Sequence, residues 1–329
     1  MKCIKKVKKK SIVIFSLIML ALLLVLSACY KPIEPSVNPS PSPSTDVTIE
    51  PSPKASPSLE PSPTPTPTPT PTPSLEPSVE PSPSPTLPPK GEYIEYLDAY
   101  VDFEEAKAMS KDIIYWNKNS PPIETLDKHG AITHGDKQKK EIYLTFNLGY
   151  EHVAGNTERM LDILKERNIK ATFFMVGEYI EVFPQKVRAI YEDGHTLGGH
   201  TYYHFPPTYT MTEEELIEDF VKTEELLEIA LGDKYEKMKY FRPIASEFNE
   251  RDIYVAKSLG YTTVLFDATY DDWNRTITHG FDYAYSQLKK DIKQGAIYQL
   301  HIVTPDNIEA LPVFIDELLA DGWVFKTFD

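Results

Sequence analysis

From residue 141 onward, short apolar runs alternate with stretches whose apolar residues recur every three to four positions. The short runs indicate buried strands, and the periodic stretches indicate helices with one apolar face. The predicted strands are 141–146, 171–176, a short one at Leu197, 239–242, 262–267, 296–301 and 323–326. The predicted helices are 156–167, 184–192, 213–231, 250–259, 282–292 and 306–320. This alternation favours a parallel sheet.

Local signals predict where several helices begin. Thr212 and Glu215 have the spacing of a capping box, in which each side chain accepts a hydrogen bond from the other residue's backbone. Asn249 is placed to cap the next helix, and Asp102 to cap a short helix that runs to about residue 109. Pro184 suits the first turn of a helix. These signals support the helix assignments independently of the apolar pattern.

Polar side chains stand where several predicted strands end. Asn147, His200, Arg242, Asp272 and His301 each fall at or just past the carboxyl end of a strand. In a barrel of parallel strands these ends share one rim, where active sites lie. The sequence therefore predicts a single site at that rim.

His200 and His204 are candidate metal ligands. Imidazoles four positions apart converge on one cation if the backbone between them turns helically. Spacing alone is a weak signal, because a pair of histidines is more often solvated. The other rim residues have structural alternatives too: His301 as a buried strand histidine, Asp272 as a helix cap and Trp273 as core.

The chain begins with a basic and then an apolar segment. Six lysines lie in the first ten residues, an apolar run follows to about Leu26, and Ser27-Ala28-Cys29 comes next. This pattern predicts a secretory signal at 1–28. A cysteine after Leu-Ser-Ala resembles a bacterial lipobox, which implies cleavage before Cys29 and lipidation of its sulfur. The alternative is an uncleaved single-span anchor. We expect the remaining chain to be extracytoplasmic, at the outer face of the bacterial cell membrane.

Residues 29–90 are rich in Pro, Ser, Thr and Glu and contain a Thr-Pro repeat. Such a composition cannot build a core, so we predict a disordered, extended linker. At about 3.1 Å per residue it would reach on the order of 190 Å. We assign 91–140 to a lead-in segment and 141–329 to the folded domain. Cysteine occurs only at Cys3 and Cys29, which excludes a disulfide within that domain.

Charge narrows the classes of partner. The formal net charge is −15, and because the six leader lysines are removed with the signal, the mature part carries −21. Such a surface repels polyanions, so we expect no nucleic acid partner. A neutral glycan is compatible with it.

Over about residues 128–328 the chain resembles the polysaccharide deacetylase family (NodB homology, carbohydrate esterase family 4). It is most similar to the delta-lactam-forming muramic acid de-N-acetylases of peptidoglycan. The matching segments are Lys128-His129-Gly130-Ala131, Lys139 to Phe146, Lys239-Tyr240-Phe241-Arg242-Pro243, Asn249-Glu250-Arg251, Gly260 to Val264, Leu300-His301-Ile302-Val303 and Asp306 to Leu311. The resemblance implies a distorted (β/α)7 barrel.

The resemblance also implies a chemistry. In the family, a divalent metal such as zinc or cobalt, held by an Asp and two His, polarises the acetamide carbonyl. A second Asp takes a proton from water, and a His protonates the leaving amine. Carried onto this chain, His200 and His204 are the metal imidazoles and His301 is the general acid, oriented by Asp272. The resemblance further implies that Arg242 holds the base and that a backbone N–H near Ala245 donates to the oxyanion. It also implies that Trp273 and Tyr150 bind the substrate.

The first motif departs from the family pattern. The base position holds Asn147, whose amide cannot take a proton from water near neutral pH. A positioned base contributes about 10²–10⁴-fold to a rate. The metal-carboxylate position holds Leu148, which offers no donor atom, and two imidazoles alone make a weak site. In the third motif Ile244 replaces a Pro, and Ser246 stands at the usual Gly.

Three hypotheses follow. The first is a degenerate enzyme that binds N-acetylated cell-wall glycan, either peptidoglycan or a chitin-like oligosaccharide, and hydrolyses it weakly or not at all. The second is an active metal-dependent de-N-acetylase that uses substitute groups, namely Glu151, His152, Asp267 or Asp271. The third is a wall-associated protein without a sugar site.

Overall fold

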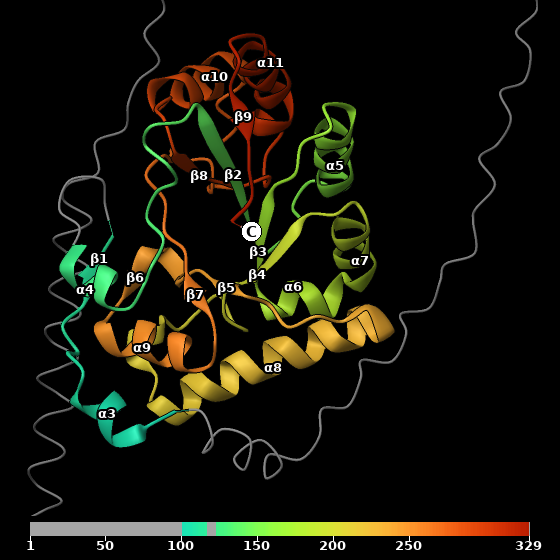
Figure 1. The fold of residues 1–329 in the computed structure, drawn as a ribbon. Helices are drawn as coiled ribbons and strands as arrows, with labels where there is room; N and C mark the ends of the chain where they lie inside the picture. Colours follow the sequence, from blue (N-terminus) through green and yellow to red (C-terminus); the bar gives the residue numbers. More distant parts are fainter. Residues whose placement is uncertain (1–100, 117–122, 329) are drawn as a thin grey trace, which may run out of the picture. The chain divides into compact units, whose positions relative to one another are not determined.

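The computed structural model describes residues 101–116 and 123–328 (Figure 1). All of them belong to one compact unit, which spans 78–329. The predicted signal, Cys29 and the linker lie outside the described residues. No helix in the described part is both long and apolar enough to span a bilayer.

A seven-stranded parallel sheet forms the centre of this unit, in the order β7-β5-β4-β3-β2-β8, with β9 also paired to β2. Its strands are β2 (Glu141–Leu148), β3 (Thr172–Met175), β4 (Thr196–Gly199), β5 (Tyr240–Phe241), β7 (Thr262–Thr263), β8 (Ala296–Leu300) and β9 (Val324–Phe325). The expected α/β class and distorted parallel barrel are confirmed.

The sheet curls because the chain changes partners after β7. Thr262 and Thr263 pair with β5, whereas Ala268 forms a parallel bridge with Tyr298 of β8. The segment between them therefore connects the two ends of the sheet. This crossing explains why the predicted strand 262–267 is regular over only two residues.

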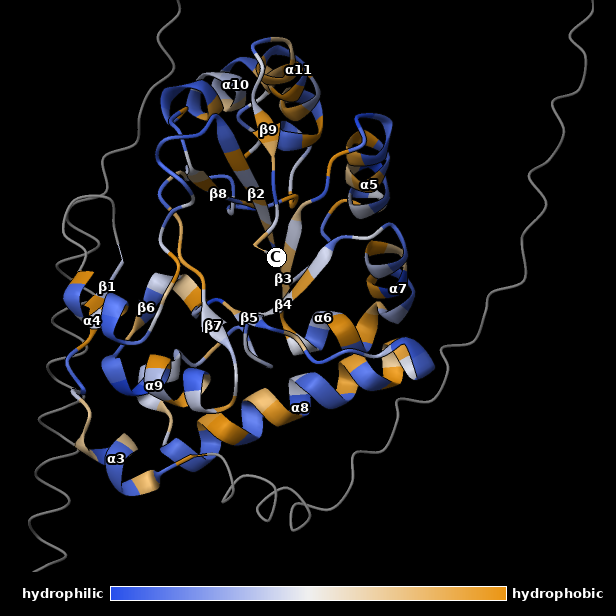
Figure 2. Ribbon diagram, viewed as in Figure 1, coloured by the Kyte–Doolittle hydropathy of each residue, from blue (hydrophilic) through white to orange (hydrophobic). Residues whose placement is uncertain are grey.

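Helices cover the outer face of the sheet (Figure 1). Their apolar sides pack against it, and Figure 2 shows hydrophobic and hydrophilic stretches on the same helices. The main helices are α5 (Asn156–Glu166), α6 (Gly177–Val182), α7 (Pro184–Glu192), α8 (Glu213–Leu231), α9 (Glu250–Ser258), α10 (Phe281–Lys290) and α11 (Asp306–Ala320). Short 3-10 turns occur at η1 (Thr208–Thr210), η2 (Gly232–Lys234) and η3 (Ile244–Ser246).

The capping signals are confirmed. Thr212 and Glu215 form a reciprocal box at α8, and Asn249 forms a second one with Asp252 at α9. The sequence did not predict α6, and it placed α10 one or two residues too late at each end. The error in α10 concerns helix ends, which are the least sharply defined part of a helix.

The lead-in segment packs along the domain through α3 (Phe103–Ala108), β1 (Ile114–Tyr115) and α4 (Ile123–Lys128). The predicted cap is present, because Asp102 accepts from the Glu105 N–H at 3.0 Å. β1 pairs antiparallel with β6 (Glu247–Phe248). The Trp116 indole donates to the Phe266 carbonyl at 2.6 Å, so this segment braces the loop that closes the sheet.

Candidate functional site

One side of the candidate site is a histidine–aspartate pair at the end of β8. His301 Nδ1 lies 2.8 Å from an Asp272 carboxylate oxygen, and the His301 backbone N–H donates to the other oxygen at 2.7 Å. Asp272 is almost fully buried. Because an ionised carboxylate only accepts, Nδ1 carries the proton and Nε2 is left for proton transfer. Asp272 is therefore not a helix cap.

Two residues support this pair: Asn307, for which the sequence predicted no role, and Tyr270, which the sequence suggested as an aromatic that stacks on sugar or packs in a loop. The Asn307 amide donates to Asp272 and to the His301 carbonyl, both at 2.7 Å. The Tyr270 hydroxyl donates to Asn307 Oδ1 at 2.8 Å. Asn307 lies in a motif segment that resembles the family, but its spacing from Asp272 gives no hint of contact.

The other side of the site lies at the end of β2 and is organised around a buried guanidinium. Arg242 Nη1 donates to Thr145 Oγ1 at 2.7 Å and to Asn147 Oδ1 at 3.0 Å. Arg242 is completely buried, and its guanidinium lies 4.0 Å from the centre of the Phe174 ring. It has no carboxylate partner among the described residues. Burial of the charge therefore holds the Arg242 pKa well below its ordinary value.

Strand register separates Asn147 from Leu148. Asn147 is paired with Phe174, on the face that carries Arg242. Leu148 is paired with Met175, and both belong to the hydrophobic core under the helices. Successive residues of a strand point to opposite faces. The position of the expected metal carboxylate is thus filled by a packed core side chain.

The two imidazoles do come together. The His200 and His204 rings are 5.7 Å apart and nearly perpendicular. His200 Nδ1 donates to the Arg242 carbonyl at 2.7 Å, which leaves its Nε2 available. Burial, together with the neighbouring His204, lowers the His200 pKa to about 3, so this ring is neutral.

The loop between these histidines is held in an unusual conformation. Thr201 has a φ of 64°, in the left-handed region that is costly for a β-branched residue. The buried Asp219 of α8 compensates by accepting the Tyr202 N–H with both carboxylate oxygens at 2.9 Å. The α-helix that follows this loop thus helps to set its conformation.

The residues present do not fit a usual metal site. Within 101–116 and 123–328, no group of three or more His, Cys, Asp or Glu side chains could hold a metal ion. His200 and His204 supply two nitrogens, and Leu148 supplies nothing. A protein zinc site usually has at least three protein ligands.

The substitute carboxylates are engaged elsewhere. Glu151 accepts from the Gly155 N–H at 3.0 Å and pairs with Lys186 at 2.9 Å. Asp267 accepts the Ile297 N–H at 2.9 Å on the closing segment. Asp271 accepts the Tyr283 hydroxyl at 2.9 Å. Among the described residues, none of the three forms a metal-binding group with His200 and His204.

Aromatic side chains are exposed around the rim. Trp273 is 62% exposed and Tyr150 is 49% exposed, so neither is a core residue. The Tyr150 ring lies 6.3 Å from that of His204 and 6.0 Å from that of His152. The exposed Ala245 has a φ of 51°, and its neighbour Ser246, at the family's usual glycine, has a φ of 60°.

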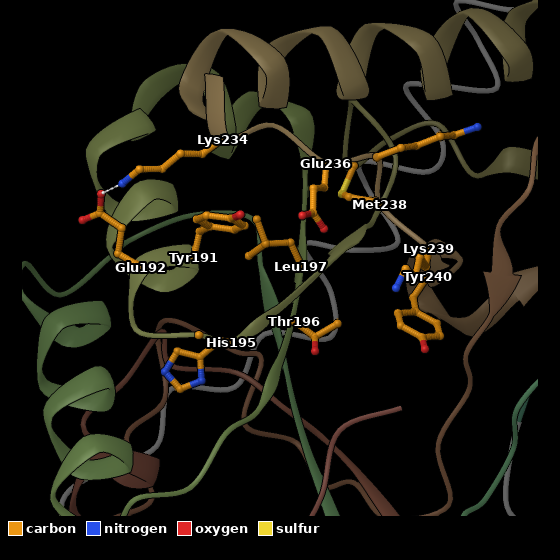
Figure 3. Close-up of a pocket in the computed structure, with 12 residues that line it drawn as sticks. Tyr191, Glu192, His195, Thr196, Leu197, Lys234, Glu236, Met238, Lys239 and Tyr240 are labelled. Carbon is orange, nitrogen blue, oxygen red and sulfur yellow. Dashed lines mark hydrogen bonds and ion pairs between the residues drawn. The ribbon is translucent and has the colours of Figure 1, made fainter. Parts of the chain in front are cut away.

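A cavity of about 580 Å³ lies at the opposite end of the sheet. Figure 3 shows its lining, which comes from residues just before or at the start of β4 and β5. Thr196 and Tyr240 open those two strands. None of the candidate catalytic or metal residues lines this cavity, so it is separate from the rim site.

Comparison with known proteins agrees with this fold. The family model described as polysaccharide deacetylase matches residues 134–264. The peptidoglycan-N-acetylmuramic acid deacetylase PdaA of Bacillus subtilis is 33% identical over 236 residues, which cover 68% of this chain and 88% of PdaA. The chain therefore belongs to the polysaccharide deacetylase family, carbohydrate esterase family 4.

Among solved structures, PdaA matches with a TM-score of 0.62 and 31% identity, over 66% of this chain and 95% of that chain. A family 4 pseudoenzyme from Bacillus anthracis matches with a TM-score of 0.54 and 27% identity, over 59% of this chain and 66% of that chain. A mutant of that pseudoenzyme is described as having restored enzymatic activity.

Proposed function

We propose that the domain binds N-acetylated cell-wall glycan at the rim and has lost efficient de-N-acetylation. One observation carries this proposal. The base and metal-carboxylate positions hold Asn147 and Leu148, while the Asp272–His301 pair is intact. The relatives named as peptidoglycan deacetylases make a peptidoglycan-like ligand the best candidate.

The remaining groups cannot complete the hydrolysis. Asn147 has no lone pair basic enough to take a proton from water, and Leu148 cannot ligate a cation. His301 could still protonate an amine, but only after water has attacked the carbonyl. Binding requires none of these missing groups, because exposed aromatic rings and hydrogen bonds suffice to hold a sugar.

The pseudoenzyme from Bacillus anthracis offers a precedent within the family. Its mutant with restored activity indicates that a family 4 pseudoenzyme can regain enzymatic activity through mutation. In this chain, positions 147 and 148 are the candidates for restoring activity by mutation.

The test is acetate release from peptidoglycan fragments and chitooligosaccharides with added zinc or cobalt. The wild-type domain should release acetate at a rate close to that of the buffer control. Turnover at ordinary enzyme rates would reject the proposal.

The two alternatives have their own tests. If the domain is a de-N-acetylase with substitute ligands, it should bind metal tightly, and His200→Ala should abolish that binding. Calorimetry that detects no metal binding rejects this alternative. A protein without a sugar site is excluded if the domain pulls down with cell walls and N-acetylglucosamine or muramic acid oligomers compete it off.

We further propose that residues 1–28 are a lipoprotein signal and that Cys29 is lipidated. The linker 29–90 would then hold the domain away from the outer face of the membrane. The full chain should take up radiolabelled fatty acid in a bacterial host. A Cys29→Ala variant that retains the label would contradict this.

A further inference from the structure

The orientation of the Asn147 amide is set by its partner. A guanidinium has only donors, so the group that meets Arg242 Nη1 at 3.0 Å must be the amide oxygen. The reverse orientation would place an NH2 group against another N–H donor. The Asn147 oxygen is therefore fixed toward Arg242, and its Nδ2 is directed away from it.

Nδ2 keeps access to solvent. Arg242 is the only hydrogen-bond partner of the Asn147 side chain among the described residues. The buried side-chain atoms without a partner in that part of the chain belong to His195, Asn249 and His279, so Asn147 Nδ2 is not one of them. An atom without a partner that is not buried must reach solvent.

That access opens on the rim. On the amino-terminal side of Asn147, the space is filled by Thr145, Arg242 and Phe174, which are all completely buried. Asn147 is the second-last residue of β2, and it shares the end of the sheet with the carboxyl end of β4, where His200 follows. Asn147 is 6% exposed, and the Nδ2 side of its amide, opposite to Arg242, is therefore the side directed toward the rim.

The replaced carboxylate has therefore become a donor. An ionised Asp at this position would only accept hydrogen bonds, as a base that receives a proton must. Asn147 instead offers N–H bonds to an acceptor. The strongest neutral acceptor that distinguishes an N-acetylated sugar from an ordinary one is the acetamide carbonyl oxygen.

We infer that Asn147 is a specificity-determining residue whose Nδ2 donates to the acetamide carbonyl of the bound sugar. This inference rests on the proposed glycan-binding function. It makes the altered base position a recognition group for the N-acetyl substituent, and it requires no bound cation.

The experiment uses two neutral ligands that differ in this group. Isothermal titration of the full-length protein with tetra-N-acetylchitotetraose and with cellotetraose, both in EDTA, compares acetamide with hydroxyl at C2. One hydrogen bond accounts for about a two- to tenfold difference in Kd. The wild type should prefer the acetylated tetramer by this factor, and Asn147→Asp should lose the preference.

Two further variants make the result decisive. Asn168→Asp adds the same charge at an exposed position before β3, so it should keep the wild-type preference. Asn147→Ala removes the donor without adding charge and should also lose the preference for the acetylated tetramer. This variant keeps the inference testable if Asn147→Asp does not fold. Equal binding of both tetramers by the wild type, or an unchanged preference in the Asn147 variants, overturns the inference and leaves glycan binding standing. No binding of either tetramer or of peptidoglycan fragments sinks the proposed function itself.

Discussion

The two sides of the candidate site differ in the groups that they keep for the family's chemistry. At the end of β8, His301, Asp272 and Asn307 form a hydrogen-bonded unit that leaves His301 Nε2 for proton transfer. At the end of β2, the buried Arg242 faces an amide and three further neutral oxygens, and the adjacent position is Leu148. The first side holds a proton-transfer pair, while the second lacks both a base and a ligand.

This difference shows how the fold can keep its shape while the polar groups at its rim change. Arg242 can retain its place because Thr145, Asn147 and backbone carbonyls satisfy its donors. Leu148 adds to the core instead of leaving a hole. The fold therefore accommodates both Asn147 and Leu148.

The largest expected effect comes from restoring the two missing carboxylates at the end of β2. The double variant Asn147→Asp, Leu148→Asp supplies a base beside Arg242 and a carboxylate at the metal-ligand position. Acetate release with zinc should rise by about 10²–10⁴-fold over wild type. The same double variant with His301→Ala serves as the control and should lose the gain. No increase, in a protein whose melting shows that it is folded, would contradict the interpretation of β2.

The next effect tests the intact side in that restored background. Asp272→Asn removes the carboxylate that orients His301, so acetate release should fall about 10²-fold. Asp271→Asn changes the neighbouring exposed carboxylate and serves as the matched control, with little expected effect. If both variants lose activity equally, Asp272 has no special role.

A smaller effect concerns stability. Asn147→Asp alone gives the buried Arg242 a counter-charge, which should stabilise the fold by about 1.5–3 kcal/mol at pH 7. For a domain of this size that raises the melting temperature by roughly 4–10 °C. The guanidinium should depress the pKa of the new carboxyl. The gain is therefore full above the unfolded Asp pKa of about 4 and is lost as pH falls through the lower folded value.

Thermal melts of wild type, Asn147→Asp and Asn168→Asp at pH 7 and pH 3 measure this effect. Asn168→Asp adds the same charge away from Arg242 and should not stabilise. A lower melting temperature for Asn147→Asp than for wild type at pH 7 would show that Arg242 does not need a carboxylate.

The smallest expected effect tests whether Asn307 holds the His301–Asp272 pair in place. Asn307→Ala in the restored background removes two hydrogen bonds of 2.7 Å, one to Asp272 and one to the His301 carbonyl. Acetate release should fall about tenfold, in proportion to one net hydrogen bond. Asn274→Ala, on the loop after Trp273, is the matched control. An unchanged rate in Asn307→Ala would mean that Asp272 is held without it.

Much of the fold was predictable because its signals are local. The helix Pro184–Glu192 and the helix Asp306–Ala320 have the predicted bounds, and the capping boxes at Thr212 and Asn249 are present. The segment 262–267 was not predictable, because its apolar run is divided between two strand partners. Local pattern cannot show where a strand exchanges one neighbour for another.

By itself, the sequence determined the parallel α/β class, the set of polar residues at the strand ends and the absence of carboxylates at positions 147 and 148. Periodicity, capping and residue type carry that information. Only the tertiary structure decided that Arg242 is buried without a counter-charge, that Asn307 secures Asp272, and that Glu151 is bound elsewhere. The physical reason is that charge compensation and hydrogen-bond geometry depend on residues 35 to 95 positions apart, whose distances only the folded chain sets.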